Sequence, residues 1–125
     1  MSSNQRKEEF RRRTKAFAGA VIKLYCSLPK QRDEVRILGK QLLRSGTSVA
    51  ANYREASRAR SDAEFVSKIE QCAQEADESM LWLELLHDDC HIDSELLEDL
   101  LRESDELLSI FVTMSKNVKK RLSEE

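Results

Sequence analysis

The sequence predicts an all-α protein, an antiparallel up-down four-helix bundle. Apolar residues recur every three or four positions along four long segments, which places them on one face of a helix. The chain contains one proline and three glycines, so few positions interrupt a helix. Its 125 residues correspond to a single domain, 1–125, because a chain of this length builds one core.

Each predicted helix has a recognisable boundary. Pro29 ends the first, because the residue before a proline disfavours helical geometry. Ser61 and Glu64 form a capping-box pattern at the start of the third, in which each side chain accepts a backbone N–H, and Asp93 or Ser94 can cap the fourth. The short connections make neighbouring helices antiparallel. The helices are expected at about 4–28, 33–57, 61–87 and 93–121.

The second helix carries polar residues in its apolar seam. Ser45 and Asn52 occupy seam positions, where polar side chains fix helix register at some cost in stability. A buried Asn52 needs a hydrogen-bond partner, and Glu55, three residues further, is one candidate. The seam faces the bundle core, a neighbouring subunit or a ligand. Small residues on this helix should let a neighbouring helix approach closely: Gly46, Ala50 and Ala51.

The third and fourth helices carry more apolar residues than one core stripe needs. On the fourth helix, a first stripe is assigned to the core: Leu96, Leu100, Leu107, Ile110 and Met114. The additional residues indicate either a thick core or a protein interface, and we favour the interface. The candidate interface residues are Trp82, Leu97, Leu101, Leu108 and Phe111.

Charge is divided unevenly along the chain. Residues 1–60 contain 15 Lys/Arg and 5 Asp/Glu, whereas residues 61–125 contain 6 and 18. The basic residues form a solvated surface, a surface for nucleic-acid phosphates, or a contact with the acidic half of a neighbouring subunit, which can close into a ring. The candidate nucleic-acid-binding residues are Arg11, Arg12, Arg13, Lys15, Arg36, Lys40, Arg44, Arg54, Arg58 and Arg60.

No catalytic or metal site is predicted, and no cofactor. His87, Cys90 and His91 suggest a metal centre, but no matching ligands occur elsewhere, so a polar helix end is the better interpretation. Cys26 and Cys72 have no histidine in their own segments to activate a thiolate. We therefore expect a protein that is not an enzyme.

Three cysteines without disulfide spacing indicate a reducing, cytoplasmic location. The polar N-terminal residues do not resemble a secretory signal. No run of eighteen apolar residues occurs, so no contact with a membrane is expected.

The stretch QLLRSGTSVAANYREASRARSDAEFVSKIEQCAQEADESMLWLELL (41–86) resembles a family signature. The family is the bacterial four-helix-bundle family that includes the large-subunit rRNA intervening-sequence proteins. LYCSLPK (24–30) also resembles the end of its first helix, and the similarity extends over about residues 16–115. The matching positions are Gln41, Leu42, Arg44, Ser45, Ser48, Asn52, Glu55, Ala56, Ser61, Phe65, Glu78, Trp82 and Leu83.

The resemblance implies a four-helix bundle that assembles as a ring, with a homopentamer expected, and no enzymatic activity. Relatives include the accessory protein of diversity-generating retroelements, a basic ring that binds nucleic acid and a reverse transcriptase. We expect a non-enzymatic oligomer that binds RNA or DNA weakly through the basic surface of its first two helices. The alternative is a structural or adaptor protein whose charge asymmetry serves self-assembly and contact with a protein partner.

Overall fold

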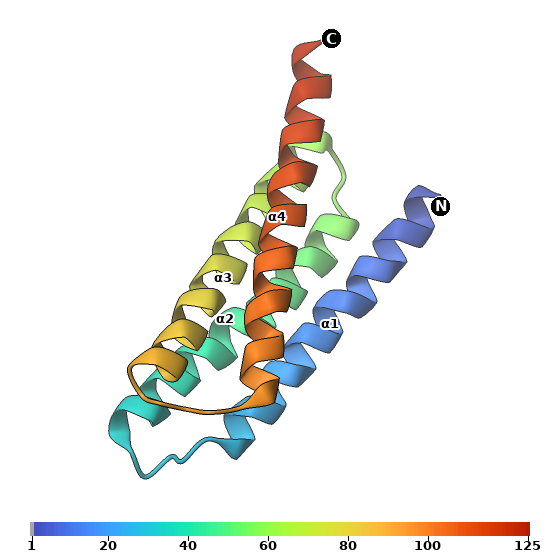
Figure 1. The fold of residues 1–125 in the computed structure, drawn as a ribbon. Helices are drawn as coiled ribbons and strands as arrows, with labels where there is room; N and C mark the ends of the chain where they lie inside the picture. The colour runs from blue at the N-terminus through green and yellow to red at the C-terminus, as the bar shows by residue number, and fades with distance from the viewer. Residues whose placement is uncertain (1) are drawn as a thin grey trace.

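The computed structural model describes residues 2–125 and consists of four long helices (Figure 1). They are α1 (Ser3–Ser27), α2 (Asp33–Ser57), α3 (Asp62–Asp88) and α4 (Glu95–Ser123). Each boundary lies within two residues of the range expected from the sequence, and the described residues contain no strand. The predicted all-α four-helix bundle is confirmed.

The helices stand in a square in chain order. α1 contacts α2, α2 contacts α3, α3 contacts α4, and α4 contacts α1, which leaves α1 diagonal to α3. Figure 1 shows both termini and the α2–α3 turn at one end of the bundle, and the α1–α2 and α3–α4 connections at the other. The first half of α1 diverges from α4 at the end that holds the termini (Figure 1).

The helix starts follow the sequence, with one difference. Ser61 Oγ accepts the Glu64 N–H at 3.1 Å, as predicted. The Glu64 side chain accepts the N–H of Arg60 (3.3 Å), whereas the predicted capping box needs it to accept the N–H of Ser61. At α4, Ser94 Oγ accepts the N–H of Leu97 at 3.2 Å. Each contact satisfies a backbone donor that the first helical turn leaves unpaired.

The core lies between the four helices and corrects the predicted interface on α4. Leu97 and Phe111 are both fully buried within the subunit, so they do not form an interface. Ser104 occupies a core position between Leu100 and Leu107, so the apolar residues alone do not trace the buried face of α4. The buried residues of α4 are Leu97, Leu100, Ser104, Leu107, Phe111 and Ser115.

The polar seam of α2 is only partly as predicted. Ser45 is fully buried, and its Oγ lies 2.8 Å from Ser79 Oγ on α3. Asn52 is only half-buried, and Glu55 is exposed. The Glu55 carboxylate pairs with Lys68 on α3 at 2.9 Å, so it does not serve as the partner of a buried Asn52. The expectation for Asn52 was wrong, because the buried face of α2 continues from Val49 to Tyr53 and leaves Asn52 beside it.

The small residues of α2 divide between two faces. A Cβ on Gly46 would lie 2.8 Å from Cγ2 of Val21 on α1, so this glycine permits a close helix contact, as predicted. Ala50 and Ala51 instead lie on the outward side of α2, in a surface groove. Close approach was the wrong explanation for these two alanines.

Candidate nucleic-acid interface

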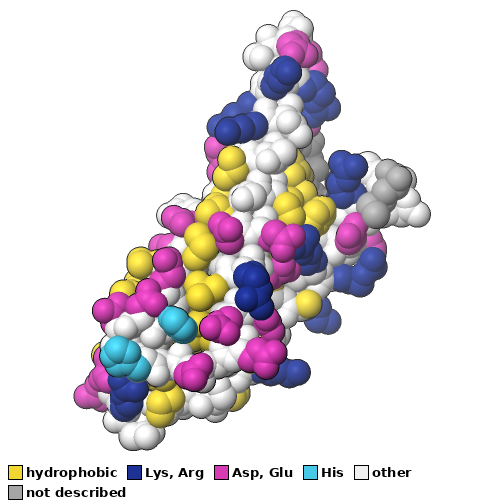
Figure 2. Space-filling model, in the orientation of Figure 1, with side chains coloured by type: hydrophobic (Ala, Val, Ile, Leu, Met, Phe, Trp, Pro, Cys, Tyr) yellow, Lys and Arg dark blue, Asp and Glu magenta, His cyan; other side chains and the backbone are white. Residues whose placement is uncertain are grey.

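The charge separation lies mainly along the axis of the bundle. At the end with the termini, residues 2–15, 51–68 and 112–125 carry 14 Lys/Arg and 7 Asp/Glu. The rest of the chain carries 7 and 16. Figure 2 shows Lys and Arg side chains gathered toward the end where α4 finishes, with Asp and Glu more frequent toward the other. The fold therefore adds the C-terminal lysines to the basic end of the molecule.

Two of the predicted phosphate-binding arginines form ion pairs with carboxylates on another helix of the subunit. Arg13 binds Glu103 with two contacts, Nη2 to Oε1 at 2.7 Å and Nε to Oε2 at 2.8 Å, and lies 3.3 Å from Glu106. The hydrogen bonds that Arg13 donates to Glu103 raise the pKa of its guanidinium. Arg44 lies 3.3 Å from Glu75 and 3.1 Å from Glu78 on α3. Both arginines therefore link helices of the same subunit.

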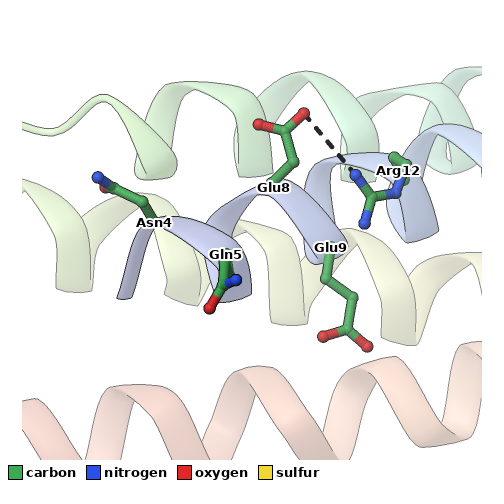
Figure 3. A pocket seen from close by; sticks show the side chains of 5 residues that line it. All are labelled: Asn4, Gln5, Glu8, Glu9 and Arg12. Carbon is green, nitrogen blue, oxygen red and sulfur yellow. Dashed lines mark ion pairs between the residues drawn. The ribbon is translucent and has the colours of Figure 1, made fainter. Parts of the chain in front are cut away.

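The remaining predicted cations outside the groove do not form one basic surface. Arg36 pairs with Asp33 in the same helix at 3.0 Å, and Lys40 is exposed. Arg12 lies 3.9 Å from Glu8. Figure 3 shows Arg12 on the first turns of α1 with Glu8 and Glu9, so carboxylates of its own helix accompany this arginine.

Five of the ten predicted residues meet in one open groove. It has a volume of about 820 Å³ and follows the outward face of α2, between α1 and α3. Thr47, Ala50 and Ala51 of α2 form a floor of small side chains, next to Ala18 of α1. Lys68 of α3 adds a sixth basic residue. The basic lining residues are Arg11, Lys15, Arg54, Arg58, Arg60 and Lys68.

Most of these cations are free of internal carboxylates. Arg11 donates from Nη1 to Ser57 Oγ and from Nη2 to Glu8, both at 3.0 Å, and Lys68 pairs with Glu55. The other four, by contrast, have no carboxylate oxygen within 4.0 Å of a side-chain nitrogen in the part of the chain that the structure describes. These residues are Lys15, Arg54, Arg58 and Arg60.

Lys68 was missed because it belongs to the acidic part of the sequence. It is the only lysine between residues 61 and 115. The signal that places it is the antiparallel register of α2 and α3, which sets Glu55 opposite Lys68. The sequence alone does not define that register.

No aromatic side chain lines the groove. Tyr53, near the basic residues in the sequence, is fully buried on another face of α2. Its ring centroid lies 6.0 Å from that of Phe10 and 6.1 Å from that of Phe111. Burial raises the pKa of Tyr53 to about 12. The tyrosine therefore belongs to the core.

The cysteine and histidine residues are dispersed. Burial raises the pKa of the Cys72 thiol to about 12, which keeps it protonated at neutral pH. His87 Nδ1 lies 2.8 Å from the Asp88 carboxylate, and this hydrogen bond raises the pKa of the exposed imidazole. Within residues 2–125, no three His, Cys, Asp or Glu side chains gather in a way that would hold a metal ion.

Three of the predicted interface residues keep part of their surface exposed. Trp82, Leu101 and Leu108 are half-buried and pack against the core. Their role in an interface stays a prediction. None of the helices described in residues 2–125 combines the length and hydropathy that crossing a membrane requires.

Comparison with known proteins agrees with the fold and with the sequence signature. The family model for 23S rRNA-intervening sequence proteins matches residues 6–113. A crystal structure from Bacteroides thetaiotaomicron, of a protein with unknown function from the S23 ribosomal protein family, is similar with a TM-score of 0.76 and 34% sequence identity. The match covers 85% of this chain and 97% of that chain. No curated protein matches. The chain therefore belongs to the 23S rRNA-intervening sequence protein family.

Proposed function

We propose that the protein binds RNA through the phosphate backbone, using the basic groove on α2. The observation that carries the proposal is the set of groove cations without an internal carboxylate partner: Lys15, Arg54, Arg58 and Arg60. An unpaired guanidinium or ammonium group in an open groove is available to an external anion. The family description, which refers to an intervening sequence of 23S rRNA, supports RNA as the polymer.

Binding of this kind depends steeply on salt. Each phosphate that a lysine or arginine neutralises releases condensed counterions, and the affinity falls as the salt concentration rises. Four engaged cations correspond to a slope of log K against log salt of about −3 for a single strand and about −4 for a duplex. A slope near zero contradicts phosphate contacts.

The test is fluorescence anisotropy of a labelled RNA at about 50 mM and about 200 mM salt. The groove variant is Arg54→Gln with Arg58→Gln, and we expect it to bind about tenfold more weakly or worse. The matched control is Lys23→Gln with Lys40→Gln, which removes the same charge from two exposed residues outside the groove. Absence of binding at the lower salt, or an equal loss in the control, contradicts the proposal.

We also propose that the protein self-associates, because two opposite faces of the bundle carry incompletely covered apolar side chains. On the α2–α3 face, Ile37 is 53% exposed and Leu81 is 46% exposed. The register set by Ser45 and Ser79 places Ile37 beside the last turns of α3, which hold Leu81 and the half-buried Trp82.

The opposite face, between α1 and α4, contains a groove that includes Phe10, Ile110 and Met114. Contacts between the opposite faces of successive subunits are heterologous and close into a ring when the rotation allows. This arrangement supports the ring, with the homopentamer as its expected form.

Size-exclusion chromatography with light scattering measures the mass of the protein in solution and so tests self-association. We expect a mass above the 14.4 kDa of one chain, and a lower mass for the variant Ile37→Glu with Leu81→Glu. The control is Leu122→Glu, which adds a charge at an apolar residue of similar exposure near the end of α4. A parent protein that elutes with the mass of a single chain contradicts self-association.

A further inference from the structure

We propose that the groove binds base-paired RNA and contacts only its sugar–phosphate backbone, without engaging a base. The inference rests on the proposed function and names the form of RNA that the same groove takes. Three features of the groove support it: the side chains that are missing from its lining, the placement of its charges, and its length.

The described lining of the groove offers no aromatic ring on which an unpaired base can stack. Proteins that hold single strands combine a basic groove with aromatic side chains, and each stacked base strengthens binding by about fivefold to a hundredfold. Here the lining consists of Arg, Lys, Glu, Thr and Ala. Tyr53, which directly precedes Arg54, is 1% exposed and lies between Phe10 and Phe111. A single strand would gain backbone contacts here and leave its bases without an aromatic partner.

The charges surround the space that a backbone ridge would fill. Arg11 and Lys15 lie one turn apart on α1, Arg54 and Arg58 lie one turn apart on α2, and Lys68 stands on α3. Between them, Ala50 and Ala51 keep the floor low. A double helix presents its phosphates as a ridge with the bases turned inward, and duplex RNA is recognised largely by this shape. The groove fits a ridge whose outer surface is charged along its length.

The length of the groove matches a short segment of backbone. From Thr47 to Arg58 the floor follows about 16 Å of helix, at 1.5 Å per residue. Phosphates of one strand are spaced about 3.4 Å apart along a duplex axis and farther apart along the backbone itself, so this length covers at most about five phosphates. Six basic and two acidic side chains line the groove, so its net charge of +4 offsets most of the charge of the segment it covers.

The experiment compares three RNA ligands that carry the same number of phosphates. They are a self-complementary hairpin, an unstructured strand, and an abasic strand of the same length. We expect the hairpin to bind at least about fivefold more tightly than the unstructured strand. The affinities for the unstructured and abasic strands should agree within about twofold, because the gain of at least about fivefold per base that stacking on an aromatic ring gives is absent. The variant with Arg54→Gln and Arg58→Gln should weaken binding of all three ligands.

Each outcome bears on a separate claim. An unstructured strand that binds about fivefold or more tightly than the abasic strand shows that bases are engaged, and overturns the inference. If the affinity for the unstructured strand equals or exceeds the affinity for the hairpin, the preference for paired RNA is overturned. In both cases binding to RNA, and with it the proposed function, survives. If none of the three ligands binds at low salt, the proposed function itself fails.

Discussion

Two faces of α2 use small residues for opposite purposes. On the face toward α1, Gly46 lies against Val21 so closely that a methyl group would already overlap it. On the outward face, Ala50 and Ala51 leave an open floor bordered by Arg54 and Arg58. The same low bulk brings two helices together on one side and keeps a surface groove open on the other. The size of a residue therefore does not define its role; the face on which it lies does.

The largest expected difference in stability between the two faces comes from one substitution to leucine on each. Gly46→Leu should lower the free energy of unfolding by about 3 kcal/mol or more, since Val21 is fully buried and has no room to move. Ala50→Leu should change it by less than about 0.5 kcal/mol, because the new side chain extends into the groove. Urea unfolding followed by circular dichroism measures both. Equal losses would show that the floor of the groove is packed against another element.

Partial filling of the groove also has a functional consequence. Ala50→Leu should weaken RNA binding while leaving the fold intact, because it raises the floor on which the backbone would lie. Anisotropy on the same sample that gave the unfolding curve provides this comparison. Unchanged affinity would mean that RNA contacts only the rim of the groove.

A smaller difference in stability should separate a buried residue of α2, Ser45, from Asn52 at the edge of its buried face. Ser45→Ala should cost about 1 kcal/mol, because it removes a buried hydrogen bond to Ser79. Ser79 keeps its bond to the Glu75 carbonyl at 2.9 Å, which limits the loss. Asn52→Ala should fall within about 0.5 kcal/mol, since Asn52 is only half-buried. Thermal melting of both variants tests the order, and a larger loss for Asn52→Ala would place Asn52 in a buried contact.

The smallest expected effect on stability separates two arginines of the same helix. Arg44→Gln should cost about 0.5–1 kcal/mol, because it leaves the Glu75 and Glu78 carboxylates side by side without their cation. Arg54→Gln should leave unfolding nearly unchanged and weaken RNA binding by about three- to tenfold. Denaturation and anisotropy on both variants measure the contrast. If either variant lowered both the free energy of unfolding and the affinity for RNA, the distinction between the paired Arg44 and the groove residue Arg54 would fail.

The cost of losing Arg44 should depend on pH. Burial, and then the neighbouring Glu78, raise the pKa of the Glu75 carboxyl above its ordinary value of 4.5, while Arg44 opposes this rise. A carboxyl with a raised pKa in the folded state contributes stability below its unfolded pKa and loses it as the pH rises through the folded value. Without Arg44 the pKa rises further. Arg44→Gln should therefore destabilise the protein more at pH 7 than near pH 4, and a constant difference between the two would exclude Glu75 as the cause.

Most of the fold follows from local patterns. The spacing of apolar residues, Pro29 and the serines at helix starts define four helices within two residues of their ends, because these signals act within one or two turns. The core line of α4 was harder to predict, since Ser104 is buried where periodicity favours an apolar residue. A small hydroxyl that bonds the carbonyl of Leu101 fits such a position, and hydropathy gives no sign of this.

The candidate site needed tertiary register. Ten basic residues were predicted from sequence clusters, and five of them meet in the groove. The sequence does not distinguish Arg13 and Arg44 from Arg54 and Arg58. The carboxylates that pair with the first two lie on other helices, far along the chain. Lys68 was missed for the same reason. Spacing along one helix identifies which residues share a face, and only packing identifies what that face meets.

Because two of the three cysteines are buried, one exposed thiol is left to which a reporter group can be attached. Cys26 is exposed at the last turn of α1, whereas Cys72 and Cys90 are buried. This places the reactive thiol at the opposite end of the bundle from both termini and the α2–α3 turn (Figure 1). A dye attached there by thiol chemistry stays away from the basic groove without any engineered substitution, whereas a tag on either terminus would stand at the end of the molecule that the groove approaches.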